Sequence, residues 1–265
     1  MFRTISVRTS LNLLRQGLNV IFVLAQVVVT LSGYITGTNS NFDSREATTP
    51  VVPASYAFII WGVIYAGAIV YAIYQALPRQ RENALLRRIG FYTAFAYLAT
   101  TLWLIAAQNG MLWLTVVFIF LILASLLGAF IQFILYYQFI SAAERFLVVL
   151  PISVYTGWAT VASIANTSTV LQASGFSNVI FPNDAWAIIM LIIGGLIAAF
   201  TTFRSRGNIG YALTVIWALI GVAVANGTTG AGAAVATVAT GSAVLVALVL
   251  LLTRRAADAL ISRPA

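Results

Sequence analysis

The side chains of this chain that could do chemistry are aromatic rings, amides and hydroxyls. The sequence has no cysteine and no histidine, which removes thiolate nucleophiles, disulfides and the commonest general base and metal ligand. The six carboxylates all lie outside the long apolar segments: Asp43, Glu46, Glu82, Glu144, Asp184 and Asp258. We therefore expect no catalytic residues and no metal site, and an intramembrane hydrolase or ion-coupled carrier is disfavoured.

Tryptophans are instead distributed over the apolar segments. Trp61, Trp103 and Trp158 fall at or near the outer half of the second, third and fifth segments, where their rings could converge and stack on a flat apolar ligand. The same rings could equally fill the interior of a helix bundle or touch lipid. Amides and hydroxyls within the segments, such as Asn19 and Gln75, are expected mostly to hydrogen-bond neighbouring helices.

Eight charge-free apolar segments must position these side chains. They span residues 18–35, 56–76, 89–107, 111–133, 146–164, 185–203, 209–225 and 233–252. About 20 helical residues cross a hydrocarbon core, and a helix satisfies its own backbone in lipid. Since 61% of the chain is hydrophobic and 8% charged, we predict an all-α polytopic membrane bundle. Asn-Gly pairs at 109–110 and 226–227 predict tight turns, and Pro151 predicts a kink or a later start of the fifth helix.

All fourteen basic residues are arginine, and threading the chain through eight spans places thirteen of them on one side, with Arg45 alone on the other. Arginine resists translocation, so this asymmetry predicts cytoplasmic N- and C-termini in a multi-pass protein of a bacterial inner or cell membrane. The first span is expected to be a retained signal anchor. Because the arginines lie at span ends, we expect them to contact lipid head groups, and we expect no nucleic-acid partner.

Two outer connections are long enough to cover the mouth of the bundle, at residues 36–55 and 165–184. The second carries Phe176 and Phe181, which suggests a short helix lying on the membrane or on the bundle. Ordinary solvated loops are the alternative.

Three segments resemble the TspO/MBR family, the tryptophan-rich sensory proteins and translocator proteins. Residues 53–65, Pro-Ala-Ser-Tyr-Ala-Phe-Ile-Ile-Trp-Gly-Val-Ile-Tyr, resemble the second-helix motif of that family. Residues 150–160, Leu-Pro-Ile-Ser-Val-Tyr-Thr-Gly-Trp-Ala-Thr, are similar to the fifth-helix signature, and Leu102-Trp103 is similar to part of the third. The match is partial, because Ile152, Tyr155 and Trp158 replace the family's Tyr, Trp and Phe.

The resemblance covers about residues 18–171 and implies a five-helix TspO-like core at 1–172, followed by a three-helix extension with a basic tail at 173–265. It implies a membrane receptor or sensor for a hydrophobic planar ligand that is tetrapyrrole- or sterol-like. If the protein carries a cofactor, the resemblance implies a bound porphyrin or related tetrapyrrole. Homodimers occur in the family. The residues implied to bind the ligand are Trp61, Tyr65, Trp103, Pro151, Tyr155 and Trp158. We expect no enzyme activity, although the resemblance leaves porphyrin degradation open.

Two other functions remain open on the sequence. The aromatic and small-residue faces could belong to a structural or accessory subunit of a membrane protein or pigment-protein complex. A small-molecule transporter is the third possibility, although the aromatic motifs have no counterparts in the last three spans and so show no internal repeat.

Overall fold

The computed structural model describes residues 2–38, 49–176, 182–227, 229–230 and 232–261. Within them, eight helical segments are long and apolar enough to cross a membrane by length and composition, which confirms the predicted all-α membrane bundle. The long helices are α1 (Phe2–Thr36), α2 (Ile60–Ala76), α3 (Ala84–Gln108), α4 (Leu112–Leu135), α6 (Leu150–Ala173), α7 (Asn183–Arg204), α8 (Ile209–Asn226) and α9 (Ala233–Ile261). The short elements are η3 (Ser55–Ile59), η4 (Pro78–Gln80), η5 (Tyr137–Phe139), α5 (Ala142–Glu144) and η6 (Arg145–Val149).

Both Asn-Gly pairs form the predicted turns. Helix α3 ends at Gln108 and Gly110 takes a positive φ of 67° before α4 begins. Helix α8 ends at Asn226 and Gly227 takes a φ of 70°. Glycine adopts these angles without the steric cost that other residues meet, so each helix can stop abruptly and turn back.

Pro151 lies near the start of α6, in the fifth span. The span begins at Ala142, where Ser141 and Glu144 form a capping box, and continues through the π-helical turn η6 into α6. Pro151 is the second residue of α6, so its missing N–H falls where the hydrogen-bonding pattern changes from π to α.

Helix α6 runs to Ala173, past the predicted end at 164. The connection predicted at 165–184 is therefore shorter than expected, because its first part continues the helix. The short helix expected around Phe176 and Phe181 falls mainly on residues 177–181, which lie outside the described residues, as do residues 39–48 of the other outer connection.

The chain divides into two compact units. Among the described residues, the first unit contains 2–38 and 62–152, and the second contains 49–61 and those from 153 onward. The division falls inside α2 and α6 and does not follow the predicted boundary at residue 172. The five-plus-three organisation stays a prediction.

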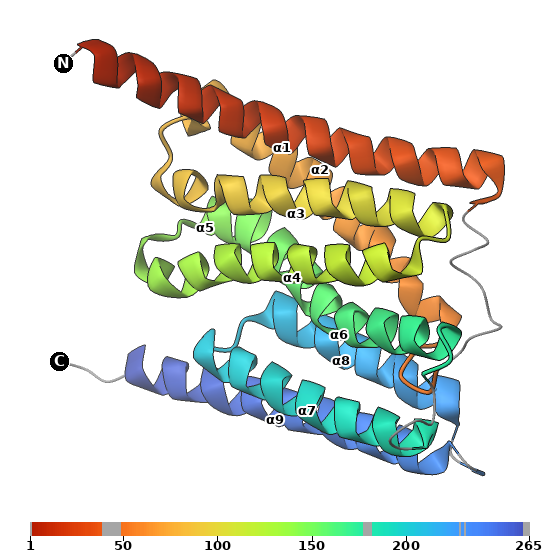
Figure 1. The fold of residues 1–265 in the computed structure, drawn as a ribbon. Helices are drawn as coiled ribbons and strands as arrows, with labels where there is room; N and C mark the ends of the chain where they lie inside the picture. The colour runs from red at the N-terminus through yellow and green to blue at the C-terminus, as the bar shows by residue number, and fades with distance from the viewer. Residues whose placement is uncertain (1, 39–48, 177–181, 228, 231, 262–265) are drawn as a thin grey trace. The chain divides into compact units, whose positions relative to one another are not determined.

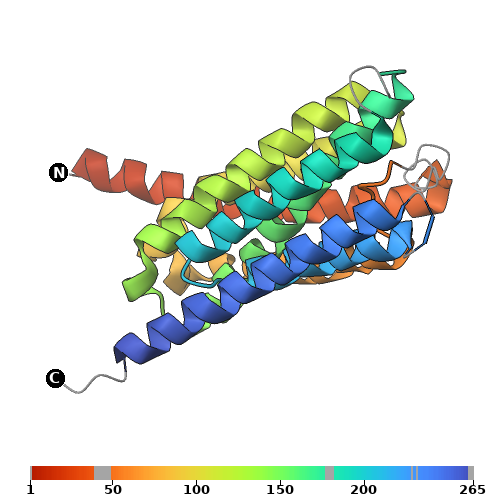
Figure 2. The same ribbon diagram turned by 90° about the horizontal axis from the view of Figure 1, so that it is seen from below.

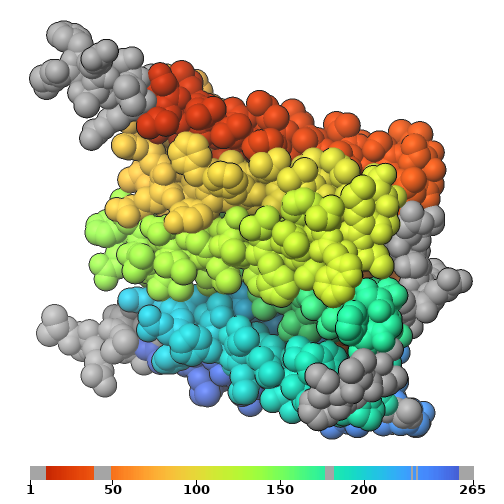
Figure 3. Space-filling model, in the orientation of Figure 1, coloured from red at the N-terminus to blue at the C-terminus, as the bar shows by residue number. Residues whose placement is uncertain are grey.

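In the first unit, α3 packs against α1 and α4, and the three helices run side by side (Figure 1). Their side chains fill the space between the ribbons (Figure 3). Close approach depends on missing side chains: a Cβ on Gly128 of α4 would lie 2.5 Å from the ring of Tyr92 on α3.

In the second unit, α9 packs against α7 and α8 (Figures 1 and 2). Gly195 of α7 faces Ser242 of α9, where a Cβ would lie 2.7 Å from the serine Oγ. Such small-residue contacts are the ordinary way for membrane helices to approach closely.

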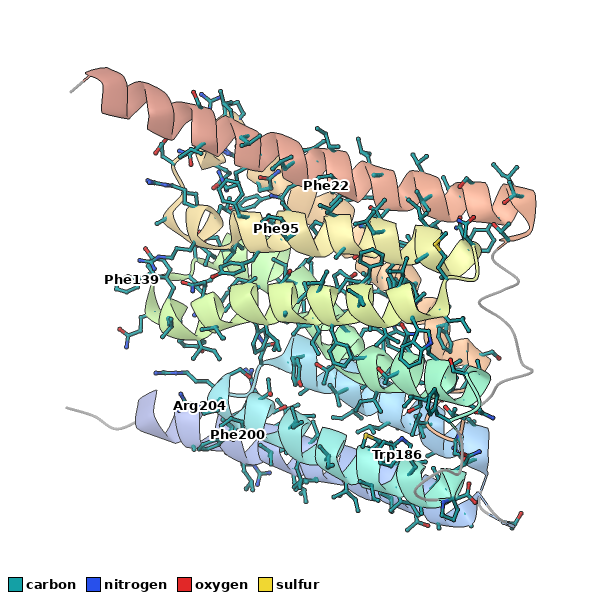
Figure 4. All side chains as sticks on the ribbon, in the orientation of Figure 1. Phe22, Phe95, Phe139, Trp186, Phe200 and Arg204 are labelled. Carbon is teal, nitrogen blue, oxygen red and sulfur yellow. The ribbon has the colours of Figure 1, made fainter. Side chains whose placement is uncertain are left out.

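Many large apolar side chains of the described residues are exposed. Phe95 of α3 is 61% exposed and Phe200 of α7 is 65% exposed (Figure 4). In a soluble protein such a surface would be a liability, whereas in a bilayer it contacts lipid tails. The chain is an integral membrane protein.

Candidate functional site

Four aromatic side chains of the second unit gather into one group, which we call the aromatic cluster: Phe58, Trp61, Tyr155 and Trp158. The ring centroids of Phe58 and Trp158 lie 5.5 Å apart, and those of Trp61 and Trp158 lie 6.4 Å apart. Tyr155 lies 6.2 Å from Trp61. All three pairs meet edge to face, the arrangement that the ring quadrupoles favour.

Tyr155 and Trp158 share one face of α6 because they are three residues apart. They are 3% and 2% exposed. Elsewhere on α6, Gly157 lies against α8, where an added Cβ would be 2.7 Å from the backbone oxygen of Tyr211. Asn208 also donates from Nδ2 to Oγ of Ser153 at 2.9 Å. Helix α8 therefore fixes α6 and, with it, the two cluster residues that α6 carries.

Phe58 lies on η3 and Trp61 at the start of α2, and α8 also holds this segment. The indole Nε1 of Trp217 donates to the backbone oxygen of Ala57 at 3.0 Å, and its ring packs against Tyr56 with 5.4 Å between centroids. Trp217 thus fixes the residue next to Phe58.

Two further contacts tie the same segment to α8. The backbone N–H of Ala54 donates to the oxygen of Gly221 at 2.9 Å, and Asn226 donates from Nδ2 to the oxygen of Pro50 at 2.7 Å. Gly221 permits this approach because a Cβ there would lie 2.9 Å from that of Ala57. Helix α8 is therefore the common support of both halves of the aromatic cluster.

One polar group in the cluster is left without a partner. The Nε1 of Trp158 is buried and has no hydrogen-bond partner, whereas the Nε1 of Trp217 is satisfied. A buried donor without an acceptor carries a desolvation penalty of about 1–3 kcal/mol. The cluster can therefore offer this N–H to an acceptor on a bound molecule.

The side of the cluster formed by η3 and the start of α2 is the more accessible one. Phe58 is 37% exposed and Trp61 is intermediate, while Tyr155 and Trp158 are buried.

The second unit also contains a small recess between α6, α7 and α8. It is lined by Val51, Thr160, Val161, Ile164, Met190, Leu191, Gly194, Gly195, Val215 and Leu219. The lining is apolar apart from Thr160, whose hydroxyl donates to the oxygen of Thr156 at 2.9 Å. The recess suits an alkyl group rather than a polar one.

The structure brings together three of the six predicted site residues, Trp61, Tyr155 and Trp158. The other three have contacts in the first unit. The hydroxyl of Tyr65 shares a hydrogen bond of 2.8 Å with that of Thr30, Trp103 is buried on α3, and Pro151 lies against Gly67, 3.0 Å from where its Cβ would be. Their role in ligand binding stays a prediction.

Two residues of the site were missed on the sequence. Phe58 was named in the family motif but not as a site residue, although its spacing of three from Trp61 could have indicated a shared face. Trp217 lies beyond residues 18–171, which carry the family resemblance. Its partner, Ala57, is 160 residues away, and no local pattern indicates that contact.

Some polar side chains of the first unit make the expected hydrogen bonds between helices, whereas hydroxyls such as that of Thr101 donate to their own helix, here to the backbone oxygen of Tyr97 at 2.9 Å. Thr93 of α3 donates to Oδ1 of Asn19 on α1 at 2.7 Å, and Gln75 of α2 donates to the oxygen of Gln16 at 3.0 Å. Among the described residues, no three His, Cys, Asp or Glu side chains gather in a way that could hold a metal ion.

A family model described as TSPO-like protein matches residues 16–252. The match continues into α9 and so extends beyond residues 18–171, which carry the motif resemblance. No curated protein and no solved structure matched the chain.

Proposed function

Because the chain belongs to the family of TSPO-like proteins, we propose that it is a membrane receptor for a hydrophobic planar ligand of the tetrapyrrole or sterol kind. The observations that support this function are the meeting of the rings of Trp61, Tyr155 and Trp158 and the buried indole N–H of Trp158, which has no partner. Aromatic faces bind flat apolar molecules by stacking, and one unsatisfied donor selects a ligand with an acceptor group.

The proposed binding mode follows from the exposure of the four rings. The ligand stacks on Phe58 and Trp61, the more exposed members of the cluster. Its acceptor, a carbonyl or carboxylate oxygen, takes the hydrogen bond from Nε1 of Trp158. Because Trp158 is buried, the rings in front of it must shift on binding, which makes the ligand-bound state different from the free one and suits a sensor.

In this function the protein binds its ligand without converting it to a product. The cluster contains no carboxylate, thiol or imidazole that could act as acid, base or nucleophile, so a bound porphyrin should be recovered chemically unchanged.

The test is a titration of the purified full-length protein in detergent with protoporphyrin, followed by tryptophan fluorescence and by the porphyrin absorption band. We expect saturable quenching together with a shifted absorption band. A flat fluorescence response to protoporphyrin and to a sterol would overturn the proposal. A stoichiometric protein partner that co-purifies in the absence of any ligand response would instead support an accessory subunit.

A further inference from the structure

Arg15 is a buried arginine inside the first candidate membrane span, Ser10–Thr36. Its sequence position predicts an exposed arginine at a span end, whereas in the structure Arg15 is 1% exposed. Its side chain lies over Gly90 of α3, where a Cβ would come within 2.5 Å of its Cγ. The missing side chain at Gly90 makes room for the arginine.

The guanidinium of Arg15 is mostly unsatisfied. Nη2 donates to the backbone oxygen of Arg81 at 3.2 Å, but Nε and Nη1 have no hydrogen-bond partner. Arg15 makes no ion pair with any described residue. A buried charge without a counter-charge is strongly disfavoured, so these three N–H donors are poised for an acceptor that carries negative charge.

The nearby carboxylate of Glu82 already has other partners. Glu82 accepts a hydrogen bond on Oε1 from Asn12 at 2.9 Å, and its Oε2 lies 3.5 Å from Nη1 of Arg87. The connection between α2 and α3 and the first turns of α3 carry four arginines, Arg79, Arg81, Arg87 and Arg88, against Glu82 alone. Positive charge is therefore in excess in this part of the chain.

A second unpaired arginine donor lies on the residue that Arg15 contacts. The Nε of Arg81 is also buried without a partner, and the backbone oxygen of Arg81 is the one that binds Arg15. Gln16 fixes the start of this connection by donating to the oxygens of Gln75 and Leu77. Arg15 therefore contacts the backbone of Arg81, in a connection whose start is bound to α1 through Gln16.

We propose that Arg15 and Arg81 form a binding site for one anionic phosphate group at this end of the first unit. Three phosphate oxygens can take the hydrogen bonds that Nε and Nη1 of Arg15 and Nε of Arg81 leave unused. Arg15 lies five residues into the candidate span that begins at Ser10, or about 7 Å along the helix axis, and so lies close to the end of that span. The group reaches the arginines by displacing the exposed pair between Glu82 and Arg87, which costs little.

The phosphate can come from a lipid head group or from free phosphate, and two arms of one experiment separate these sources. Thermal unfolding of the full-length protein in detergent is measured with inorganic phosphate against chloride at equal ionic strength. Retention of phosphatidylglycerol against phosphatidylcholine is measured in parallel by native mass spectrometry. Protection by inorganic phosphate indicates a free-phosphate site, and selective retention of phosphatidylglycerol alone indicates a head-group site.

Matched variants identify the residues. We expect Arg15→Gln to weaken the binding about tenfold, on the scale of a lost charged hydrogen-bonding pair. Arg79→Gln, which removes an exposed arginine from the same connection, should change it less than about twofold, since surface charges are screened. If Arg15→Gln does not fold, Arg81→Gln keeps the backbone oxygen that Arg15 needs and should still weaken binding several-fold.

Equal losses in the Arg79 and Arg81 variants would overturn the proposal, because they would indicate nonspecific attraction to a basic surface. The proposal would also be overturned if neither inorganic phosphate nor phosphatidylglycerol gave a response. Water would then be the partner of the N–H donors of Arg15.

Discussion

The indole N–H groups of Trp158 and Trp217 lie in the same unit and differ in what they meet. That of Trp217 donates to Ala57 and holds the η3 segment, while that of Trp158 is buried without a partner. A satisfied donor stabilises the fold, and an unsatisfied one makes a bound acceptor favourable. At the residue scale, the proposed function therefore depends on Trp158 more than on any other side chain of the cluster.

Two substitutions at this position separate stacking from hydrogen bonding. We expect Trp158→Leu to weaken protoporphyrin binding by about 1–3 kcal/mol, because it removes the ring as well as the donor. Trp158→Phe keeps a ring and should cost about 1 kcal/mol, the value of one hydrogen bond. Affinity is measured by the absorption titration, which does not depend on the number of tryptophans.

The control for these variants is Trp113→Leu, because Trp113 is an exposed tryptophan on α4 that should leave affinity unchanged. Equal affinities in the Trp113 and Trp158 variants, or a loss of thermal stability by Trp158→Leu with unaltered affinity of the folded fraction, would make Trp158 a packing residue.

At the scale of elements, α8 supports the site. It holds α6 through the contact of Gly157 with the backbone of Tyr211, and it holds the segment before α2 through Trp217 and Asn226. The last three spans looked like an addition to a complete five-helix core, but α8 positions residues of the motifs themselves. The family match includes α8, since it extends to residue 252.

The contact between α6 and α8 can be tested with a single methyl group. We expect Gly157→Ala to destabilise the protein by about 1–3 kcal/mol, since the new Cβ meets backbone that must shift. Gly62→Ala is the matched helical control, because nothing lies within 4 Å of its added Cβ, and it should be neutral or stabilising by up to about 1 kcal/mol. Thermal unfolding in detergent compares the two, and equal melting temperatures would contradict the assigned contact.

The hydrogen bond from Trp217 of α8 to the η3 segment can be tested separately. Trp217→Phe keeps an aromatic ring beside Tyr56 but removes the donor to Ala57, so we expect a loss of about 0.5–1.5 kcal/mol in stability. Ligand affinity should fall less than in Trp158→Leu, because Trp217 acts through the position of its neighbours. An affinity loss as large as that of Trp158→Leu would instead place Trp217 in contact with the ligand.

At the scale of the whole molecule, the arginines define an expected topology. Eight spans and thirteen arginines on one side predict that both termini are cytoplasmic. Reporter fusions after Arg88, Arg145, Arg206 and Arg263 should therefore read as cytoplasmic, and fusions within residues 39–49 or 174–183 as external. A single long connection that reads on the opposite side would refute this orientation.

The sequence by itself determined the eight spans and their turns. A membrane helix satisfies its own backbone and needs only about 20 consecutive apolar residues, so its existence is a local property that a short window reveals. The turns at the two Asn-Gly pairs could likewise be predicted from neighbouring residues alone. The end of α6 was misplaced because residues 165–173 contain polar side chains, and a helix can continue with these even where the apolar stretch has stopped.

Only the tertiary structure decided what the polar and aromatic side chains do. Arg15 looks like any arginine beside an apolar segment, and its burial follows from Gly90, which lies on another helix. The link from Trp217 to Ala57 and the unpaired N–H of Trp158 likewise depend on which helices meet. Contacts between helices are set by packing across the bundle, and the pattern along one helix does not encode which partner it will face.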